Sequence, residues 1–150
     1  MVLVDTSVWI RFLTGREPYA TELDSLLERD EVAGHELVFG ELLIGDKGGR
    51  RKLLDAYEQM HQATPVPHGD VVAFVRERRL HGQGAGWFDV HLLASAIVGR
   101  YRLWTAEPRL VALAEKSTSR TRSRQPTKPP NIINIGAREC GKIRSTSTYD

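Results

Sequence analysis

The chain opens with the stretch that decides its fold, VLVDTSVWIRFL, residues 2–13. The first three residues of this stretch are apolar and rich in β-branched side chains, a pattern that predicts a buried strand. Asp5 follows at the end of that strand. Thr6 or Ser7 then caps a helix that runs to residue 13. The opening therefore predicts a buried strand that leads directly into a helix.

The same alternation continues over the next hundred residues. Apolar residues recur at helical spacing in six further segments, and three short runs resemble strands. Strands that alternate with helices imply a parallel sheet with helices on both faces, so the predicted class is an α/β sandwich. The predicted helices cover 19–29, 36–44, 52–60, 69–80, 87–98 and 107–115, and the predicted strands cover 32–33, 64–66 and 101–105.

The segment from residue 117 onward has a different composition. It is rich in Ser, Thr, Arg and Pro, and its seven Lys or Arg against two acids give a net charge of +5. Since the whole chain carries +2, residues 1–116 carry −3. We predict one domain over 1–116 and a basic tail over 117–150 that is either disordered or not native to the protein. Within the tail, only 131–135 has apolar residues that could add an edge strand.

The bulk composition excludes several classes of protein. Hydrophobic residues make up 41% and charged residues 27%, close to the average for globular domains. Cys140 is the single cysteine, so an internal disulfide is excluded and a reducing compartment fits best. No apolar stretch approaches the roughly 18 residues of a membrane span, and Asp5 interrupts the first apolar run before a signal-peptide core forms. We expect a cytoplasmic protein with no membrane association.

Four acidic residues lie in otherwise apolar stretches of the sequence: Asp5, Glu41, Asp89 and Glu107. The carboxyl ends of parallel strands line one crevice, so Asp5 and Glu107 should emerge on the same side of the sheet. Glu41 and Asp89 can reach that side from helices. A cluster of buried carboxylates without basic partners needs a cation, and Mg²⁺ or Mn²⁺ with oxygen ligands is the usual one. Such ions activate water for the hydrolysis of phosphodiesters.

Each of these acids also has a purely structural interpretation. Asp5 could cap a helix, although Thr6 or Ser7 can do so in its place. Glu41 could be a solvated helix acid. Asp89 and Glu107 could each interact with the positive end of a helix dipole. Because four such coincidences in apolar settings are hard to accept together, a metal site is the preferred hypothesis.

Four blocks of the sequence resemble, in order, those of the PIN-domain family, and in particular VapC-type toxins of bacterial toxin–antitoxin pairs. The similarity covers about residues 1–115, and the order of the blocks makes it specific. The blocks are VDTSVWI at 4–10, GELLIG at 40–45, GAGWFDVHLLA at 84–94 and LWTAEPRL at 103–110.

This resemblance implies a PIN-like three-layer α/β/α sandwich and an endoribonuclease that depends on Mg²⁺ or Mn²⁺. It also implies a homodimer, an RNA substrate cut by metal-activated water, and a VapB-like antitoxin that neutralises the toxin. The family's acids match Asp5, Glu41 and Asp89, and we take Asp5 and Asp89 as the direct metal ligands. The fourth acid of the family is normally an aspartate, and here Glu107 stands in its place as the fourth catalytic residue.

Two other functions remain open from the sequence. A PIN-like scaffold weakened at Glu107 could work as a binding module without turnover. A doubly wound signalling domain that accepts phosphate would also cluster acids at strand ends. That second class requires a lysine at a strand end, and Lys47 and Lys52 instead lie near a turn.

Several residues within the four blocks have uses that the sequence leaves open. Thr6, Ser7 and Thr105 can hold metal-bound waters or simply serve as hydrogen-bonding residues at strand and helix ends. Trp9 and Trp87 are expected in the core or in a dimer interface, with stacking on RNA bases as the alternative. His91 is expected to be structural rather than a metal ligand.

Overall fold

The computed structural model describes residues 1–118 and 132–135, and it contains a four-stranded sheet in the order β2-β1-β3-β4. β1 pairs in parallel with both β2 and β3, whereas β4 is antiparallel to β3. The prediction of a mostly parallel sheet is therefore confirmed. The strands are β1 (Val2–Val4), β2 (Val32–Ala33), β3 (Arg102–Trp104) and β4 (Ile132–Ile133).

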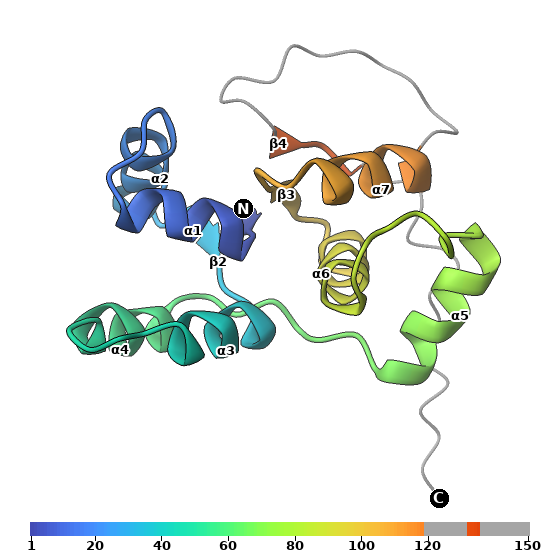
Figure 1. The fold of residues 1–150 in the computed structure, drawn as a ribbon, viewed down its shortest axis with the longest axis horizontal. Coiled ribbons are helices and arrows are strands. Elements are labelled where there is room, and N and C mark those ends of the chain that lie inside the picture. Colours follow the sequence, from blue (N-terminus) through green and yellow to red (C-terminus); the bar gives the residue numbers. More distant parts are fainter. Residues whose placement is uncertain (119–131, 136–150) are drawn as a thin grey trace, which may run out of the picture.

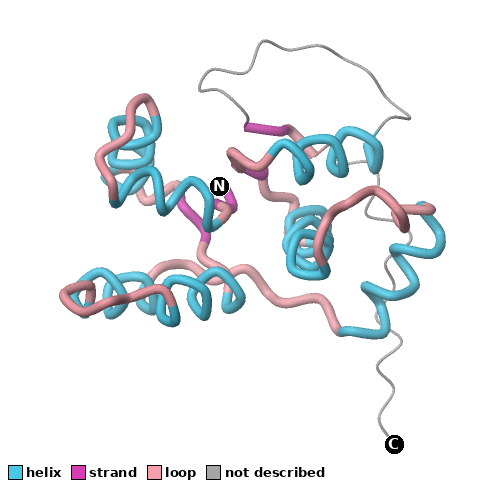
Figure 2. The backbone as a smooth tube through the Cα atoms, viewed as in Figure 1, coloured by secondary structure: helices cyan, strands magenta, loops and turns pink. Residues whose placement is uncertain are grey.

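Helices surround this sheet and connect its parallel strands (Figures 1 and 2). Within the described part of the chain, none of them is long and apolar enough to cross a bilayer. The helices are α1 (Thr6–Leu13), α2 (Tyr19–Glu28), α3 (Glu36–Ile44), α4 (Arg51–Gln59), α5 (His68–Arg78), α6 (Trp87–Val98) and α7 (Pro108–Thr118).

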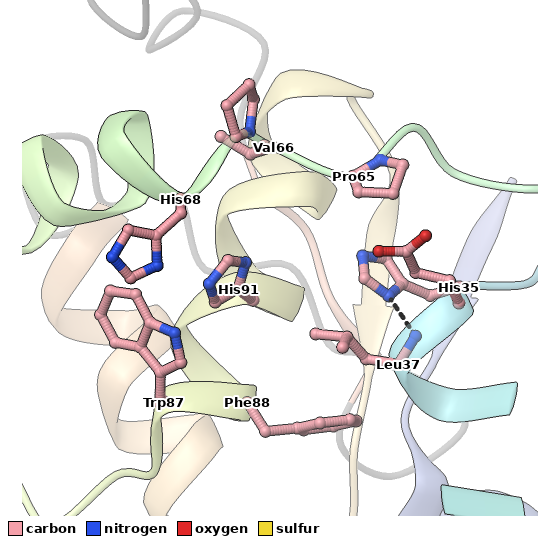
Figure 3. Close-up of a pocket in the computed structure, with 10 residues that line it drawn as sticks. His35, Leu37, Pro65, Val66, His68, Trp87, Phe88 and His91 are labelled. Carbon is pink, nitrogen blue, oxygen red and sulfur yellow. Dashed lines mark hydrogen bonds between the residues drawn. The ribbon is translucent and has the colours of Figure 1, made fainter. Parts of the chain in front are cut away.

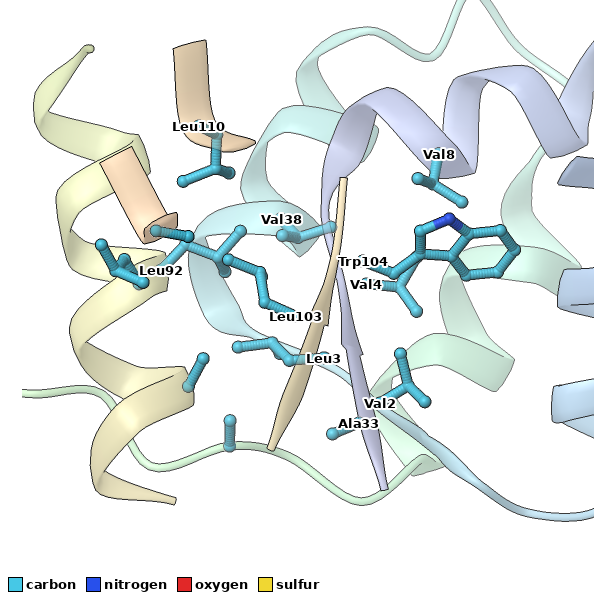
Figure 4. Packing of buried hydrophobic residues seen from close by; sticks show 14 of the residues in the cluster. Val2, Leu3, Val4, Val8, Ala33, Val38, Leu92, Leu103, Trp104 and Leu110 are labelled. Atoms are coloured by element: carbon cyan, nitrogen blue, oxygen red, sulfur yellow. The ribbon is translucent and has the colours of Figure 1, made fainter. Parts of the chain in front are cut away.

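The two central strands send alternate side chains to opposite faces of the sheet (Figure 4). Leu3 and Leu103 point toward α6, where Leu92 meets them, while Val4 and Trp104 point toward α1. Each of these five side chains is 0% exposed. A sheet buried on both faces explains why β1 is apolar throughout and why the buried residues of β3, Leu103 and Trp104, are apolar. The three-layer α/β/α arrangement is thus present.

The strand predicted over 64–66 was wrong. The chain there is irregular, and nearby only an isolated bridge joins Gly34 to Gln62. Pro65 and Pro67 cannot donate to a strand ladder, which disfavours a strand at this place. A side chain at Gly34 would force its neighbours to shift, because a Cβ there would lie 2.6 Å from the side-chain amide nitrogen of Gln62 and 2.9 Å from the ring of Tyr57.

Part of the predicted tail belongs to the sheet. Ile132 and Ile133 form β4 against Trp104 and Leu103, and Ile132 and Ile135 are buried. The possible edge strand within 131–135 is therefore present. The other tail residues, 119–131 and 136–150, lie outside the described residues, so the division into a domain and a tail remains a prediction.

Candidate active site

Asp5 lies where β1 meets α1, and its side chain is 5% exposed. It is the N-cap of α1, so the prediction that Thr6 or Ser7 takes this place was wrong. Its Oδ2 accepts hydrogen bonds from the backbone N–H of Ser7 at 3.3 Å, the hydroxyl of Ser7 at 2.5 Å and the hydroxyl of Thr105 at 2.8 Å. No described residue donates to Oδ1, which leaves that oxygen for another ligand.

Ser7 and Thr105 join the ends of the two central strands around Asp5. Their hydroxyl oxygens lie 3.4 Å apart. The backbone N–H of Ala106 donates to the Ser7 hydroxyl, and that of Glu107 donates to the Thr105 hydroxyl, each at 3.0 Å. These bonds fix the orientation of the Asp5 carboxylate and the start of the segment that carries Glu107. The sequence left both hydroxyls open, and in the structure they position Asp5.

Asp89 is in the first turn of α6, where its Oδ2 accepts a hydrogen bond from the backbone N–H of Gly86 at 3.0 Å. Burial raises the pKa of Asp89 above its ordinary value, and the Gly86 hydrogen bond opposes that effect. The negative charges of Asp5, Glu107 and Glu41 raise the pKa further. The fold therefore brings Asp5, Glu41 and Glu107 within electrostatic reach of Asp89, although they come from distant parts of the sequence.

The four acids differ in burial, contrary to the expectation that each lies in a buried neighbourhood. Asp5 is buried and Asp89 is half-buried, but Glu41 and Glu107 are exposed. Glu41 lies on the outer side of α3, next to Leu42, which packs into the core. Of the apolar residues that follow Glu41 in the sequence, Leu42 is buried, whereas Leu43 and Ile44 are exposed. Apolar neighbours in a helical sequence do not show which way a given side chain points.

The donor set of this cluster fits a hard divalent cation. In the part of the chain that the structure describes, none of the four carboxylates forms an ion pair with Lys, Arg or His. Oxygen-only donors with excess negative charge are the ligands that Mg²⁺ and Mn²⁺ prefer. Among the described residues, however, no three His, Cys, Asp or Glu side chains converge closely enough to hold one ion. The donor types at the site thus suit such a cation.

A buried histidine that no sequence pattern distinguishes links the helices that carry Glu41 and Asp89. His35 is 1% exposed, and its Nδ1 accepts a hydrogen bond from the backbone N–H of Leu37, which caps α3. Its Nε2 therefore carries the proton and donates to the hydroxyl of Ser95 on α6, 3.0 Å away. This histidine helps to fix α3 relative to α6, and with them the spacing of the two acids.

Acid should weaken the protein through His35. Burial, with a smaller contribution from His91, lowers the pKa of His35 from 6.5 to about 4. Between these two values the unfolded chain binds more protons than the folded protein, so the free energy of unfolding falls as the pH falls. The slope from this one group is at most about 1.4 kcal/mol per pH unit, and above pH 6.5 its contribution is fully present.

Urea unfolding of the wild type and of His35→Asn, between about pH 7 and pH 4.5, measures this effect. Asparagine keeps an oxygen that can cap α3 but does not titrate, so the variant should lose less stability on acidification. Equal slopes in the two proteins would show that other groups cause the acid sensitivity.

Comparisons with known proteins agree with this arrangement. The PIN domain family matches residues 2–116. Ribonuclease VapC32 of Mycobacterium tuberculosis, strain CDC 1551 / Oshkosh, is 42% identical over 118 residues, which cover 78% of this chain and 93% of the relative. Ribonuclease VapC32 of strain ATCC 25618 / H37Rv gives the same identity and coverage. The chain therefore belongs to the PIN-domain family, as a relative of the VapC ribonucleases.

Proposed function

We propose that this protein is a metal-dependent endoribonuclease that acts as the toxin of a toxin–antitoxin pair. The observation that carries the proposal is the group of four carboxylates from four separate segments. Asp5, Glu41 and Glu107 raise the pKa of Asp89. No described Lys, Arg or His side chain forms an ion pair with any of the four. The similarity to a protein named as a VapC ribonuclease supports RNA as the substrate.

The side chains have distinct roles in this proposal. Asp5 and Asp89 hold Mg²⁺ or Mn²⁺, and Glu41 and Glu107 complete the site from its exposed side. When bound, the cation activates water and offsets the charge of the phosphodiester. Because Oδ2 of Asp5 already accepts three hydrogen bonds, Oδ1 is the oxygen that faces the ligand.

The proposed partners follow from the same assignment. The protein forms a homodimer, a VapB-like antitoxin neutralises it, and both act in the cytoplasm. Leu43 and Ile44, at the end of α3, are 52% and 88% exposed. Large apolar side chains left open to water are common on surfaces that bind another protein, which supports assembly with a partner.

Cleavage of a structured RNA pool tests the proposal. Purified protein, freed of antitoxin, should cut RNA with Mg²⁺ or Mn²⁺ and should stop cutting when EDTA removes the metal. The RNA ends should be a 5′-phosphate and a 3′-hydroxyl, as expected for attack by activated water. Cleavage that continues unchanged in EDTA would exclude a metal-dependent reaction.

A catalytically weakened binding module is the second candidate. Glu107 in the place of an aspartate favours it, as does the absence, among the described residues, of three side chains that converge on one ion. This alternative predicts partner binding that needs no metal, together with no cleavage by folded protein in Mg²⁺ or Mn²⁺. If the wild type is inactive, recovery of cleavage in Glu107→Asp would assign the loss to this position.

A further inference from the structure

A pocket of about 470 Å³ lies between the first turns of α3, α5 and α6 (Figure 3). Its size is in the range of pockets that bind small molecules. Imidazole, indole and proline rings provide much of its wall, and Glu36 is the one formally charged residue among those that line it. The acid cluster does not contribute to this wall, so the pocket is a separate feature.

The wall contains the one tryptophan of this chain that is open to water. Trp87 is 45% exposed, whereas Trp9 and Trp104 are 1% and 0% exposed. Two imidazoles surround its indole: the ring of His68 lies 5.2 Å away at 58° and that of His91 lies 4.9 Å away at 81°. Figure 3 shows the three rings facing one another from α5 and α6. An exposed indole held in place by neighbouring rings is a ready surface for a flat ligand.

The two imidazoles also have free hydrogen-bonding capacity. Both ring nitrogens of His35 already form hydrogen bonds, with Leu37 and Ser95. No described residue hydrogen-bonds to the rings of His68 or His91. Burial lowers the pKa of His91, with a smaller lowering from His68 and an opposing effect of Glu36. A neutral imidazole offers one donor and one acceptor.

The residues that line the pocket favour some classes of ligand over others. A cation is disfavoured because the N-terminal ends of three helices meet there. A lone phosphate is disfavoured because the lining contains Glu36 and, among the described residues, neither Lys nor Arg. A flat uncharged heterocycle with donors and acceptors at its edge suits both the indole face and the imidazole nitrogens.

The pocket and the acid cluster lie on opposite sides of α6. Trp87 and His91 are four residues apart and share one side of α6, while Asp89, midway between them, points to the other side. The pocket and Asp89 are therefore separated by about the 10 Å width of one helix. A single RNA strand with a phosphate at the acid cluster can reach this pocket with a nearby nucleotide.

We infer that this pocket binds an unpaired nucleobase of the RNA substrate, stacked on Trp87 with the ring nitrogens of His68 and His91 at its edge. The inference rests on the proposed function. Proteins that recognise single-stranded RNA commonly stack unpaired bases on aromatic rings and hydrogen-bond to their edges. The pocket would thus select which nucleotide stands beside the bond that is cut.

The first test needs no catalysis. The indole N–H resonance of Trp87 is identified by its absence from the NMR spectrum of Trp87→Phe, and AMP, GMP, CMP and UMP are added separately to the wild type. At least one nucleotide should shift this resonance and leave those of the buried Trp9 and Trp104 in place. No shift with any of the four would overturn the inference.

The second test uses RNA cleavage. Trp87→Ala should raise KM about 5-fold to 100-fold, the usual cost of losing one stacked base, with a smaller change in kcat. Trp87→Phe keeps a ring and should restore most of the affinity. Ile10→Ala is the matched control, because it removes an exposed apolar side chain of α1 that does not line the pocket.

The outcomes separate this inference from the proposed function. If Trp87→Ala still cleaves RNA in a metal-dependent way and its KM is unchanged, the proposed nuclease function stands and the inference that the pocket binds a nucleobase is wrong. A shift of Trp87 by nucleotides in a protein that cuts no RNA would support the pocket and contradict the nuclease. If Trp87 responds to antitoxin or to protein concentration but not to nucleotides, the pocket is a protein interface and the inference is wrong.

Discussion

Asp5→Asn should abolish most of the RNA cleavage, lowering the rate by at least about 100-fold. Changes in groups that only orient metal ligands typically cost 10-fold to 100-fold, and the effect of removing a proposed ligand should reach or exceed that range. Asparagine keeps an oxygen but loses the negative charge, so it cannot balance a divalent cation. RNA cleavage under saturating Mg²⁺ or Mn²⁺ measures the effect.

Asparagine also caps helices about as well as aspartate, so the variant should keep α1 intact. Thermal unfolding of Asp5→Asn would verify that the loss of activity is not a loss of fold. Asp24→Asn, at an exposed position of α2, is a matched control and should cleave at the wild-type rate. Near-normal cleavage by folded Asp5→Asn would remove this residue from the proposed site.

The largest effect on stability should come from Trp104→Ala, with a loss of about 3–5 kcal/mol in the free energy of unfolding. Trp104 is 0% exposed, lies in β3 between Val4 and Ile132, and stacks on Tyr19 of α2 at 6.0 Å. Its removal leaves a cavity where the sheet meets a helix. A domain of this size is typically stable by only about 5–15 kcal/mol, so much of that margin would disappear.

Urea unfolding followed by far-UV circular dichroism would measure this loss without relying on tryptophan fluorescence. Trp87→Ala is the control of the same residue type, and it should cost less than about 1 kcal/mol because the side chain is largely outside the core. Equal losses in the two variants would mean that the burial of Trp104 does not govern stability.

Much of the fold could be predicted because its signals are local. The apolar run before Asp5 and the apolar residues of β3 both indicate buried strands, and the helical spacing of apolar residues located the seven helices of the described part of the chain. The wrong strand at 64–66 came from an apolar residue between two prolines, whose missing N–H groups outweigh that pattern.

The site was only partly accessible from the sequence. The sequence put Asp5 at a strand end, but it could not show that Asp5 is itself the helix cap, since Thr6 and Ser7 are equally good caps. It also could not show that Glu41 is exposed, because that depends on how α3 is rotated against the core. The pocket beside Trp87 is formed by the first turns of α3, α5 and α6. These helices are distant in sequence, and only tertiary packing brings them together.

The parallel pairing of β1 with β3 has a consequence for how the protein is made. β1 and Asp5 are synthesised before their partners in β3 and the Thr105 hydroxyl, which come about one hundred residues later in the chain. Contacts across so long a loop form late and slowly. A nascent chain that ends before β3 therefore lacks both the centre of its sheet and the bond that orients Asp5. A chain whose synthesis stops before β3 is therefore expected to have no nuclease activity.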